Sequence, residues 1–256
     1  MLTLLRPRFC YIFVFLFSPM YVKASIDEGN QAIRSFKTAK KLLMKKVEDA
    51  SSTTLYCNAS FHQDKSIELP QGFKATRHKK RSYRVEFEHV VPAENFGRNF
   101  IEWREGHPSC GINSKNGKPV KGRKCAQKVN ATYKLMQADM YNLYPAIGSV
   151  NATRQNYNFA ELGAGVPSHF GSCNFKVFKR KVEPPEAAKG RIARSYLYMD
   201  KVYSKFTMSR SQRKLMRSWD QKYPVTAQEC RRYKKIRKHQ KNDNPIMKKR
   251  CQSIQE

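Results

Sequence analysis

A glutamate and a histidine stand side by side in the segment Phe87-Glu88-His89-Val90-Val91-Pro92-Ala93, and together they could carry out hydrolysis. A hard oxygen ligand such as Glu88 suits Mg²⁺ or Ca²⁺. A neutral His89 can take a proton from water near neutral pH, and nearby cations lower an imidazole pKa and so keep the ring an acceptor. On its own, such a dipeptide is far more often an ordinary strand end with no site, so its role depends on the rest of the chain.

The element that must position this pair is a strand. Residues Val85 to Glu88 alternate apolar and charged side chains, which predicts a half-buried strand. Neighbours on a regular strand point to opposite faces, so the strand must end or bend if both side chains serve one site, and Pro92 favours an ending. The basic run from Arg77 to Arg84 precedes the strand, and we expect Arg81 and Arg84 in it to bind substrate phosphates.

Composition indicates a folded, strongly cationic protein. The 256 residues include 50 Lys+Arg against 20 Asp+Glu, a net charge of +30, which excludes an acidic disordered chain. Gly and Pro at 12 each exclude collagen-like and low-complexity architectures, and 40% hydrophobic residues suffice for one domain. The charge predicts a polyanionic partner, which on this evidence could be nucleic acid, anionic lipid or acidic polysaccharide.

Positive charge is concentrated toward the C-terminus. The last 81 residues, from Lys176, hold 24 basic and 7 acidic residues, and the density peaks between Arg231 and Lys241. This run fits either a solvated helix face or a surface that follows a nucleic-acid backbone. The interleaved Arg232-Tyr233-Lys234 favours the second interpretation.

Residues 1–24 have the pattern of a secretory signal peptide. Arg6 and Arg8 form a basic region, Phe9 to Phe17 is apolar, and small residues precede Ser25. The apolar run is much shorter than the ~20 residues that span a bilayer, so we expect cleavage, export and no membrane attachment afterwards. The predicted mature domain covers residues 25–256.

The cysteines of the mature chain predict disulfide bonds. An even number in an oxidising compartment favours three bridges over free thiols or a zinc site, and the residues concerned are Cys57, Cys110, Cys125, Cys173, Cys230 and Cys251. Fifteen pairings are possible for six cysteines. The simplest joins sequence neighbours, Cys110 with Cys125 and Cys230 with Cys251, and leaves Cys57 with Cys173.

Periodicity predicts a mixture of helices and strands. Apolar residues at helical spacing predict helices at three places: within Ile33–Ala50, after Pro185 through Tyr203, and from Ser209 through Trp219. Short apolar or β-branched runs predict strands over Thr53–Cys57 and Leu143–Val150, and a short helix could open at Asn151. Four glycines and two prolines between Gly106 and Lys124 predict an exposed excursion, tied at its base by Cys110 and Cys125.

Four ordered motifs resemble one protein family. They are Phe87 to Ala93, Gly122-Arg123-Lys124-Cys125, the segment from Met140 to Asn151 with Arg154 and Asn156, and the segment from Arg191 to Met199. Together they are similar to the bacterial endonuclease I family, exported non-specific nucleases with a ββα-metal (His-Me finger) active site. The resemblance runs over residues 35–252. It implies an α+β fold, a single compact domain in which helices surround the ββα-metal finger and disulfides staple the chain.

The resemblance also implies residue roles. His89 matches the general base that activates water, and Arg123 matches the arginine that holds the phosphate after cleavage. Glu88 and Asn151 match the two protein ligands of a single Mg²⁺, for which Ca²⁺ or Mn²⁺ could substitute. We expect Arg154 and Asn156 of the third motif to bind substrate, together with Arg81 and Arg84 of the basic run before the strand.

The predicted function is that of a monomeric endonuclease, periplasmic or secreted, that needs Mg²⁺. It should hydrolyse DNA, and RNA as well, through phosphate contacts with little sequence preference, leaving 5′-phosphates. The chain departs from the family at Ser149, Ala152 and Thr153, where acidic residues and a glycine are common. Those changes keep open an alternative, a nucleic-acid-binding protein that retains the fold with impaired catalysis. A membrane-active or glycan-binding protein would explain the charge but leave the four motifs unexplained.

Overall fold

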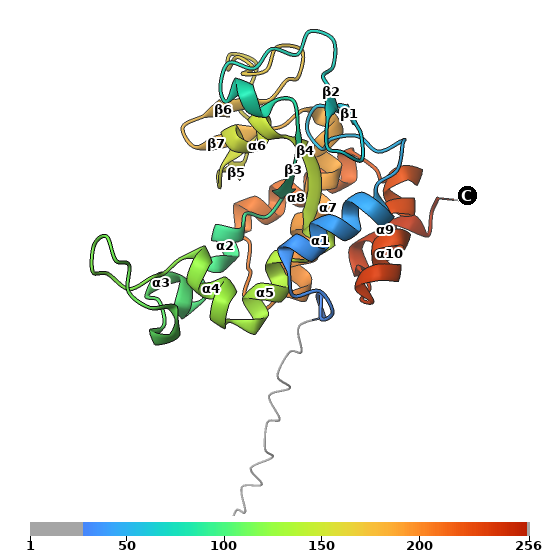
Figure 1. Ribbon diagram of the computed structural model, residues 1–256. Helices are drawn as coiled ribbons and strands as arrows, with labels where there is room; N and C mark the ends of the chain where they lie inside the picture. The colour runs from blue at the N-terminus through green and yellow to red at the C-terminus, as the bar shows by residue number, and fades with distance from the viewer. Residues whose placement is uncertain (1–27, 255–256) are drawn as a thin grey trace, which may run out of the picture.

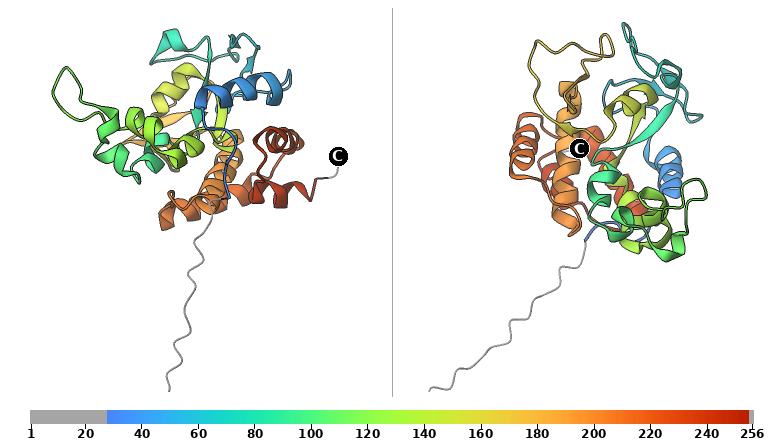
Figure 2. Two further views of the ribbon diagram at one scale, coloured as in Figure 1. Left: turned by 60° about the horizontal axis from the view of Figure 1, so that its bottom comes forward. Right: turned by 90° about the vertical axis from the view of Figure 1, so that its left-hand side faces the viewer.

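Two antiparallel strands, β3 (Val85–His89) and β4 (Leu143–Ile147), run through the middle of the molecule (Figure 1). The computed structural model describes residues 28–254, and β3 and β4 pair from Val85 opposite Ile147 to His89 opposite Leu143. All five residues of β4 are buried. Helices cover both faces of the pair, with α1 (Phe36–Leu42) on one side and α7 (Glu186–Val202) on the other (Figure 2).

The chain turns directly from β4 into helix α6 (Gly148–Arg154), which packs back onto β3. A glycine is required where that helix begins. A Cβ atom at Gly148 would lie 2.5 Å from the carbonyl oxygen of Arg81 and 2.9 Å from Oε1 of Glu86. The two strands and α6 therefore form a close ββα unit.

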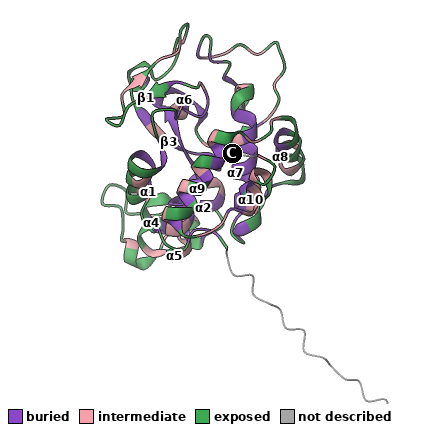
Figure 3. Cartoon of the chain, turned by 90° about the vertical axis from the view of Figure 1, so that its right-hand side faces the viewer, coloured by how far each residue is buried: buried purple, intermediate pink, exposed green. Residues whose placement is uncertain are grey.

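The remaining helices surround this unit, and α7 is the most deeply buried of them (Figure 3). In chain order the other α-helices are α2 (Ala93–Gly97), α3 (Ile101–Arg104), α4 (Arg123–Val129), α5 (Ala131–Gln137), α8 (Arg210–Lys222), α9 (Ala227–Gln240) and α10 (Pro245–Cys251). A π-helix, η1 (Leu43–Val47), continues α1, and three 3-10 turns are η2 (Lys79–Arg81), η3 (Pro108–Cys110) and η4 (Met140–Asn142).

Two small sheets flank the central pair. One joins β1 (Ser60–Phe61) and β2 (Ile67–Glu68) in antiparallel fashion. The other has the order β5-β7-β6, with strands β5 (Asn158–Phe159), β6 (Lys176–Phe178) and β7 (Lys181–Glu183). The predicted α+β class is confirmed.

Several local predictions are also confirmed. The amphipathic helix begins at Phe36 and buries Ala39, Leu43 and Val47, and Ser209 caps α8 by accepting a hydrogen bond from the amide of Gln212. The three bridges have the expected pairing, Cys57–Cys173, Cys110–Cys125 and Cys230–Cys251. The predicted signal peptide, residues 1–24, lies outside the described residues.

Two element predictions are wrong. The segment Thr53–Cys57 forms a turn instead of a strand: the amide of Asn58 donates to the carbonyl of Thr54, Asn58 adopts φ 49°, and only Thr53 bridges Ser60. The strand expected over Leu143–Val150 ends at Ile147, and the helix expected to open at Asn151 already begins at Gly148. Asn151 therefore lies one turn inside α6.

The C-terminal basic run forms α9, and part of it points inward. Tyr233 is buried, and the Arg232 side chain donates from Nε to Oε1 of Glu48 (3.0 Å) and from Nη2 to the carbonyl of Leu143 (2.7 Å). Arg232 and Tyr233 thus pack against the body of the protein, and the interpretation of these two residues as a surface that follows a nucleic-acid backbone is wrong.

Among residues 28–254, none of the helices has the length and apolar character that crossing a membrane requires.

Removing the Cys57–Cys173 bridge should destabilise the protein more than removing Cys110–Cys125. The first closes a sequence separation of 116 residues and the second one of 15. Loop-closure entropy gives about 4.7 kcal/mol for a loop of ~100 residues and about 3 kcal/mol for one of ~15. Urea unfolding of the paired Cys→Ser variants measures the difference. Equal losses of stability would contradict this account.

Candidate active site

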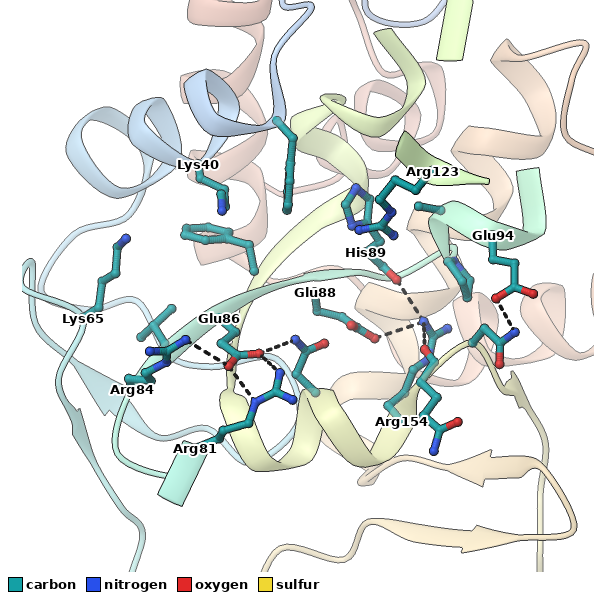
Figure 4. Close-up of a pocket in the computed structure, with 18 of the residues that line it drawn as sticks. Lys40, Lys65, Arg81, Arg84, Glu86, Glu88, His89, Glu94, Arg123 and Arg154 are labelled. Carbon is teal, nitrogen blue, oxygen red and sulfur yellow. Dashed lines mark hydrogen bonds and ion pairs between the residues drawn. The ribbon is translucent and has the colours of Figure 1, made fainter. Parts of the chain in front are cut away.

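A cavity of about 890 Å³ opens where β3 ends and α6 begins (Figure 4). Its wall holds side chains from α1, β3, α4 and α6. All eight residues predicted for catalysis, metal binding or substrate binding line it, namely Arg81, Arg84, Glu88, His89, Arg123, Asn151, Arg154 and Asn156. The structure therefore gathers into one place residues that are spread over more than seventy positions of the sequence.

Strand β3 ends at His89, and this ending lets neighbours serve one cavity. The imidazole of His89 packs against the ring of Phe36 on α1, with 4.6 Å between ring centroids. Its Nε2 lies 2.8 Å from the carbonyl oxygen of Gln137. A carbonyl can only accept, so Nε2 carries the proton and Nδ1 is the free acceptor.

The pKa of His89 is lowered to about 3, first by burial and then by the charge of Arg123. Burial disfavours the charged imidazolium, and a nearby guanidinium adds repulsion. His89 is therefore neutral at neutral pH, the form in which Nδ1 can accept a proton.

Glu88 lies on the opposite face of β3 and is 4% exposed. The hydroxyl of Tyr56 donates to its Oε1 (2.6 Å), and Nη1 of Arg154 lies 3.1 Å from the same oxygen. Burial raises the pKa of Glu88, and the charge of Arg154 opposes that shift. Within residues 28–254, Oε2 takes part in no hydrogen bond, so one carboxylate oxygen is held by the protein and the other is free.

Arg154 is buried, with its side chain 1% exposed. Its Nη1 donates to the carbonyl of His89 (2.9 Å) and its Nη2 to the carbonyl of Val90 (2.6 Å). The guanidinium thus joins the last turn of α6 to the end of β3. These contacts favour a positioning role for Arg154 over the substrate contact that we predicted.

Asn151 projects from α6, and its Nδ2 donates to Oε2 of Glu86 (2.9 Å). Oε1 of Glu86 also accepts a hydrogen bond from Nε of Arg81 (2.9 Å), and it lies 3.7 Å from Nη2 of Arg84.

Glu86 was not among the site residues predicted from the sequence. The strand alternation could have found it, because residues two apart on a strand share a face and Glu86 is two positions before Glu88.

The departures from the family pattern fit the local structure. Ala152 lies within α6 and has no positive φ, so the absence of glycine there does not disturb the backbone. Ser149 is fully buried and accepts a hydrogen bond from the hydroxyl of Ser82 (2.8 Å). The Thr153 hydroxyl donates to the carbonyl of Ser149 (2.8 Å). At these two positions, where the family resemblance leads us to expect acidic side chains, neutral ones thus form local hydrogen bonds.

The donor set fits a hard divalent ion. No group of three or more His, Cys, Asp or Glu side chains within residues 28–254 could hold a metal, so a cage made of such ligands alone is excluded there. Oδ1 of Asn151, like Oε2 of Glu88, has no hydrogen-bond partner in the described chain, and both residues line the cavity. One carboxylate oxygen and one amide oxygen are ligands that Mg²⁺ takes while keeping most of its shell for water and substrate.

Cations stand at both ends of the cavity. Arg123 begins α4 and is exposed, and Figure 4 shows it beside His89, whereas Arg81 and Arg84 lie near Glu86 at the other end. Lys40 and Lys65, which sequence analysis did not select, also line the wall. Asn156 donates from Nδ2 to Oε2 of Glu94 (2.8 Å) at the rim.

Comparison with known proteins agrees with this geometry. The model of the family described as Endonuclease I matches residues 26–251. The chain belongs to the endonuclease I family. As a member of that family it is an endonuclease, as the sequence predicts, and the family suggests a divalent metal ion as cofactor.

Individual members of the endonuclease I family are similar over most of the chain. An extracellular deoxyribonuclease of Aeromonas hydrophila is 37% identical over 226 residues, which cover 86% of this chain and 91% of that protein. A periplasmic deoxyribonuclease of the same species is 37% identical over 229 residues, 87% of this chain and 89% of its own. Endonuclease-1 of Buchnera aphidicola subsp. Acyrthosiphon pisum is 35% identical over 254 residues, 95% of this chain and 91% of its own. The two Aeromonas names agree with the predicted location, periplasmic or extracellular.

Replacing Arg154 should lower the free energy of unfolding, and its effect should not be limited to weaker substrate binding. Arg154→Ala leaves Glu88 as a buried charge without its partner, a change that typically costs about 3–5 kcal/mol. Arg154→Lys should recover little, because an ammonium cannot reach two carbonyls and a carboxylate in the geometry of a guanidinium. Urea unfolding gives the measurement. Unchanged stability with a raised KM would restore Arg154 as a substrate contact.

Replacing Glu86 should weaken binding of a divalent metal. Glu86→Ala removes the group that orients Asn151, and loss of such outer partners typically costs about 10–100-fold in metal affinity. Calorimetric titration with Mg²⁺ in the absence of DNA measures the metal affinity. Arg81→Ala is the control, because it leaves the contact between Glu86 and Asn151 in place. Equal Mg²⁺ affinity in Glu86→Ala and Arg81→Ala would show that Glu86 does not orient Asn151.

Proposed function

We propose that the protein is an exported, monomeric, Mg²⁺-dependent endonuclease that hydrolyses the phosphodiester bonds of DNA, and of RNA, with little sequence preference. One observation carries the proposal: His89 shares a cavity with one oxygen each of Glu88 and Asn151, and neither its Nδ1 nor these two oxygens has a hydrogen-bond partner within residues 28–254. The names of the Aeromonas relatives, both deoxyribonucleases, support DNA as the substrate.

His89 begins the reaction by accepting a proton from water at Nδ1. Burial and the carbonyl of Gln137 hold the ring in the tautomer that can do so. The water oxygen forms a bond to phosphorus, and the bond from phosphorus to the 3′-oxygen breaks. The leaving oxygen takes up a proton from solvent water, and His89 returns its proton to solvent, so the products are a 3′-hydroxyl and a 5′-phosphate.

The charges around the cavity suit a phosphodiester, whose negative charge repels nucleophiles. Glu88 and Asn151 would hold the Mg²⁺ through one carboxylate and one amide oxygen. When bound, the ion would supply positive charge that offsets the negative charge developing on the phosphate. Arg123, exposed at the start of α4, would hold the cleaved phosphate, because a guanidinium matches phosphate geometry with two parallel hydrogen bonds.

Low sequence preference follows from the kind of contact that the cavity offers. Its exposed cations Arg81, Arg84 and Arg123 suit phosphates, and phosphate contacts carry no base information. The reaction also needs no 2′-hydroxyl, since external water attacks phosphorus. RNA is therefore a chemically equivalent substrate.

The alternative, a binding protein with impaired catalysis, rested on the changes at Ser149, Ala152 and Thr153. The contacts of α6 weigh against it, because Asn151 keeps a carboxylate partner in Glu86 and the helix is regular. Plasmid nicking separates the two hypotheses, since a pure binding protein would bind DNA without nicking it under any divalent metal.

His89→Ala should abolish nicking of supercoiled plasmid in Mg²⁺ while DNA binding persists. A positioned general base contributes about 10²–10⁴-fold to rate. EDTA should stop the wild type, and Mg²⁺ or Mn²⁺ should restore it. The matched control is His239→Ala on α9, which should nick like the wild type. Nicking by His89→Ala at the wild-type rate, or full activity in EDTA, would refute the mechanism.

A further inference from the structure

Residues 106–122, which we call the basic arm, project from the body between α3 and α4 (Figure 1). The arm has its own hairpin-like order, since the amide of Asn113 donates to the carbonyl of Lys118 (2.8 Å) and that of Val120 to the carbonyl of Gly111 (3.0 Å). The Cys110–Cys125 bridge ties its base to α4. The arm is therefore an ordered projection fixed to the body.

The arm carries positive charge that no acidic side chain in the described part of the chain pairs with. No Asp or Glu occurs between Glu105 and Asp139 in the sequence. Along the arm and into the first turn of α4, lysines recur at every third position, and all four are exposed: Lys115, Lys118, Lys121 and Lys124. None of these four forms an ion pair within residues 28–254.

Many other cations of the chain are paired. Lys189 contacts Glu161 and Glu183, and Arg194 contacts Asp220 and Glu229. Those pairs lie inside the helical body and stabilise its packing. The four lysines at the arm, by contrast, pair with no carboxylate within residues 28–254.

The four lysines surround one hollow. A cavity of about 660 Å³ is lined entirely by the arm and Lys124, and all four ammonium-bearing side chains contribute to its wall. Like charges gathered around one space repel one another, and a bound polyanion relieves that repulsion. The side chains that line the hollow include no carboxylate that could compete for them.

Residues that are neighbours in the sequence line the hollow and the catalytic cavity. Arg123 lines the catalytic cavity, while Lys121 and Lys124 on either side of it line the hollow. This junction is held in place, because the amide of Gly122 donates to the carbonyl of Trp103 (2.9 Å) and Cys125 is fully buried. A nucleic-acid strand whose scissile phosphate lies at Arg123 would present neighbouring phosphates to the arm.

We propose that the basic arm is a second binding site for the phosphate backbone of double-stranded DNA, separate from the residues that cleave it. This inference rests on the proposed function. The arm holds duplex beyond the scissile bond, so it sets affinity and its salt dependence and leaves the chemical step unchanged.

The first experiment measures DNA binding with a cleavage-deficient His89→Ala background. A 30-base-pair duplex is titrated by fluorescence anisotropy over a range of salt concentrations, with and without Lys115→Gln, Lys118→Gln and Lys121→Gln combined. Each lost phosphate contact lowers the slope of log K against log salt by about 0.9, so the combined variant should lose about 2–3. The loss of affinity should be largest at low salt.

The control is a triple Lys→Gln variant that removes the same number of charges far from the arm. Lys238, Lys241 and Lys249 are exposed on the α9 and α10 segment, which lies across the molecule from the arm in Figure 1. Replacing these three with Gln should leave the slope close to that of the parent. An equal loss of slope in both triple variants would mean that net charge alone matters, and it would overturn the proposal.

A second measurement uses wild-type His89 and two substrate lengths. A duplex too short to leave the catalytic cavity should be cleaved equally by the arm variant and its parent. Long DNA should show a raised KM with unchanged kcat in the arm variant. A changed kcat on both lengths would overturn the proposal. If the parent cleaves nothing, the proposed function fails, whereas the binding comparison still decides the arm.

Discussion

The site depends on one buried guanidinium. Arg154 neutralises Glu88 and binds the carbonyls of His89 and Val90, so a single side chain sets the distance between the strand that carries the base and the helix that carries Asn151. A buried charge must be paired, and here the pairing engages only Oε1 of the carboxylate. The same contact that stabilises the ββα unit therefore leaves Oε2 available to a metal.

The charge of the protein is divided between two uses. Arg194, which is buried, and Arg232, which is partly buried, pair with carboxylates and join separate elements to one another. Others, Arg123 and the lysines of the basic arm, are exposed and have no ion pair within residues 28–254. A net charge of +30 thus overstates the surface available to a polyanion, and the unpaired cations beside the catalytic cavity indicate where that surface lies.

The family resemblance predicts which residue types line the site, but it does not predict which side chains surround each of them. Ser149 and Thr153 replace acidic residues close to Asn151, yet Asn151 still has a carboxylate partner. That partner, Glu86, comes from the neighbouring strand, 65 positions away in the sequence. The surroundings of Asn151 therefore depend on a contact in space that its sequence neighbours do not show.

The sequence by itself predicted the strand at Val85, the helices at Phe36 and Glu186, the simplest disulfide pairing and eight residues of the cavity wall, because periodicity, cysteine spacing and motif residues are local properties. Only the tertiary structure decided that Thr53–Cys57 turns, that α6 begins at Gly148, and that Arg154, Arg232 and Glu86 bind protein groups. Those outcomes depend on which distant carbonyls and carboxylates the folded chain brings within hydrogen-bonding distance, and no local pattern encodes them.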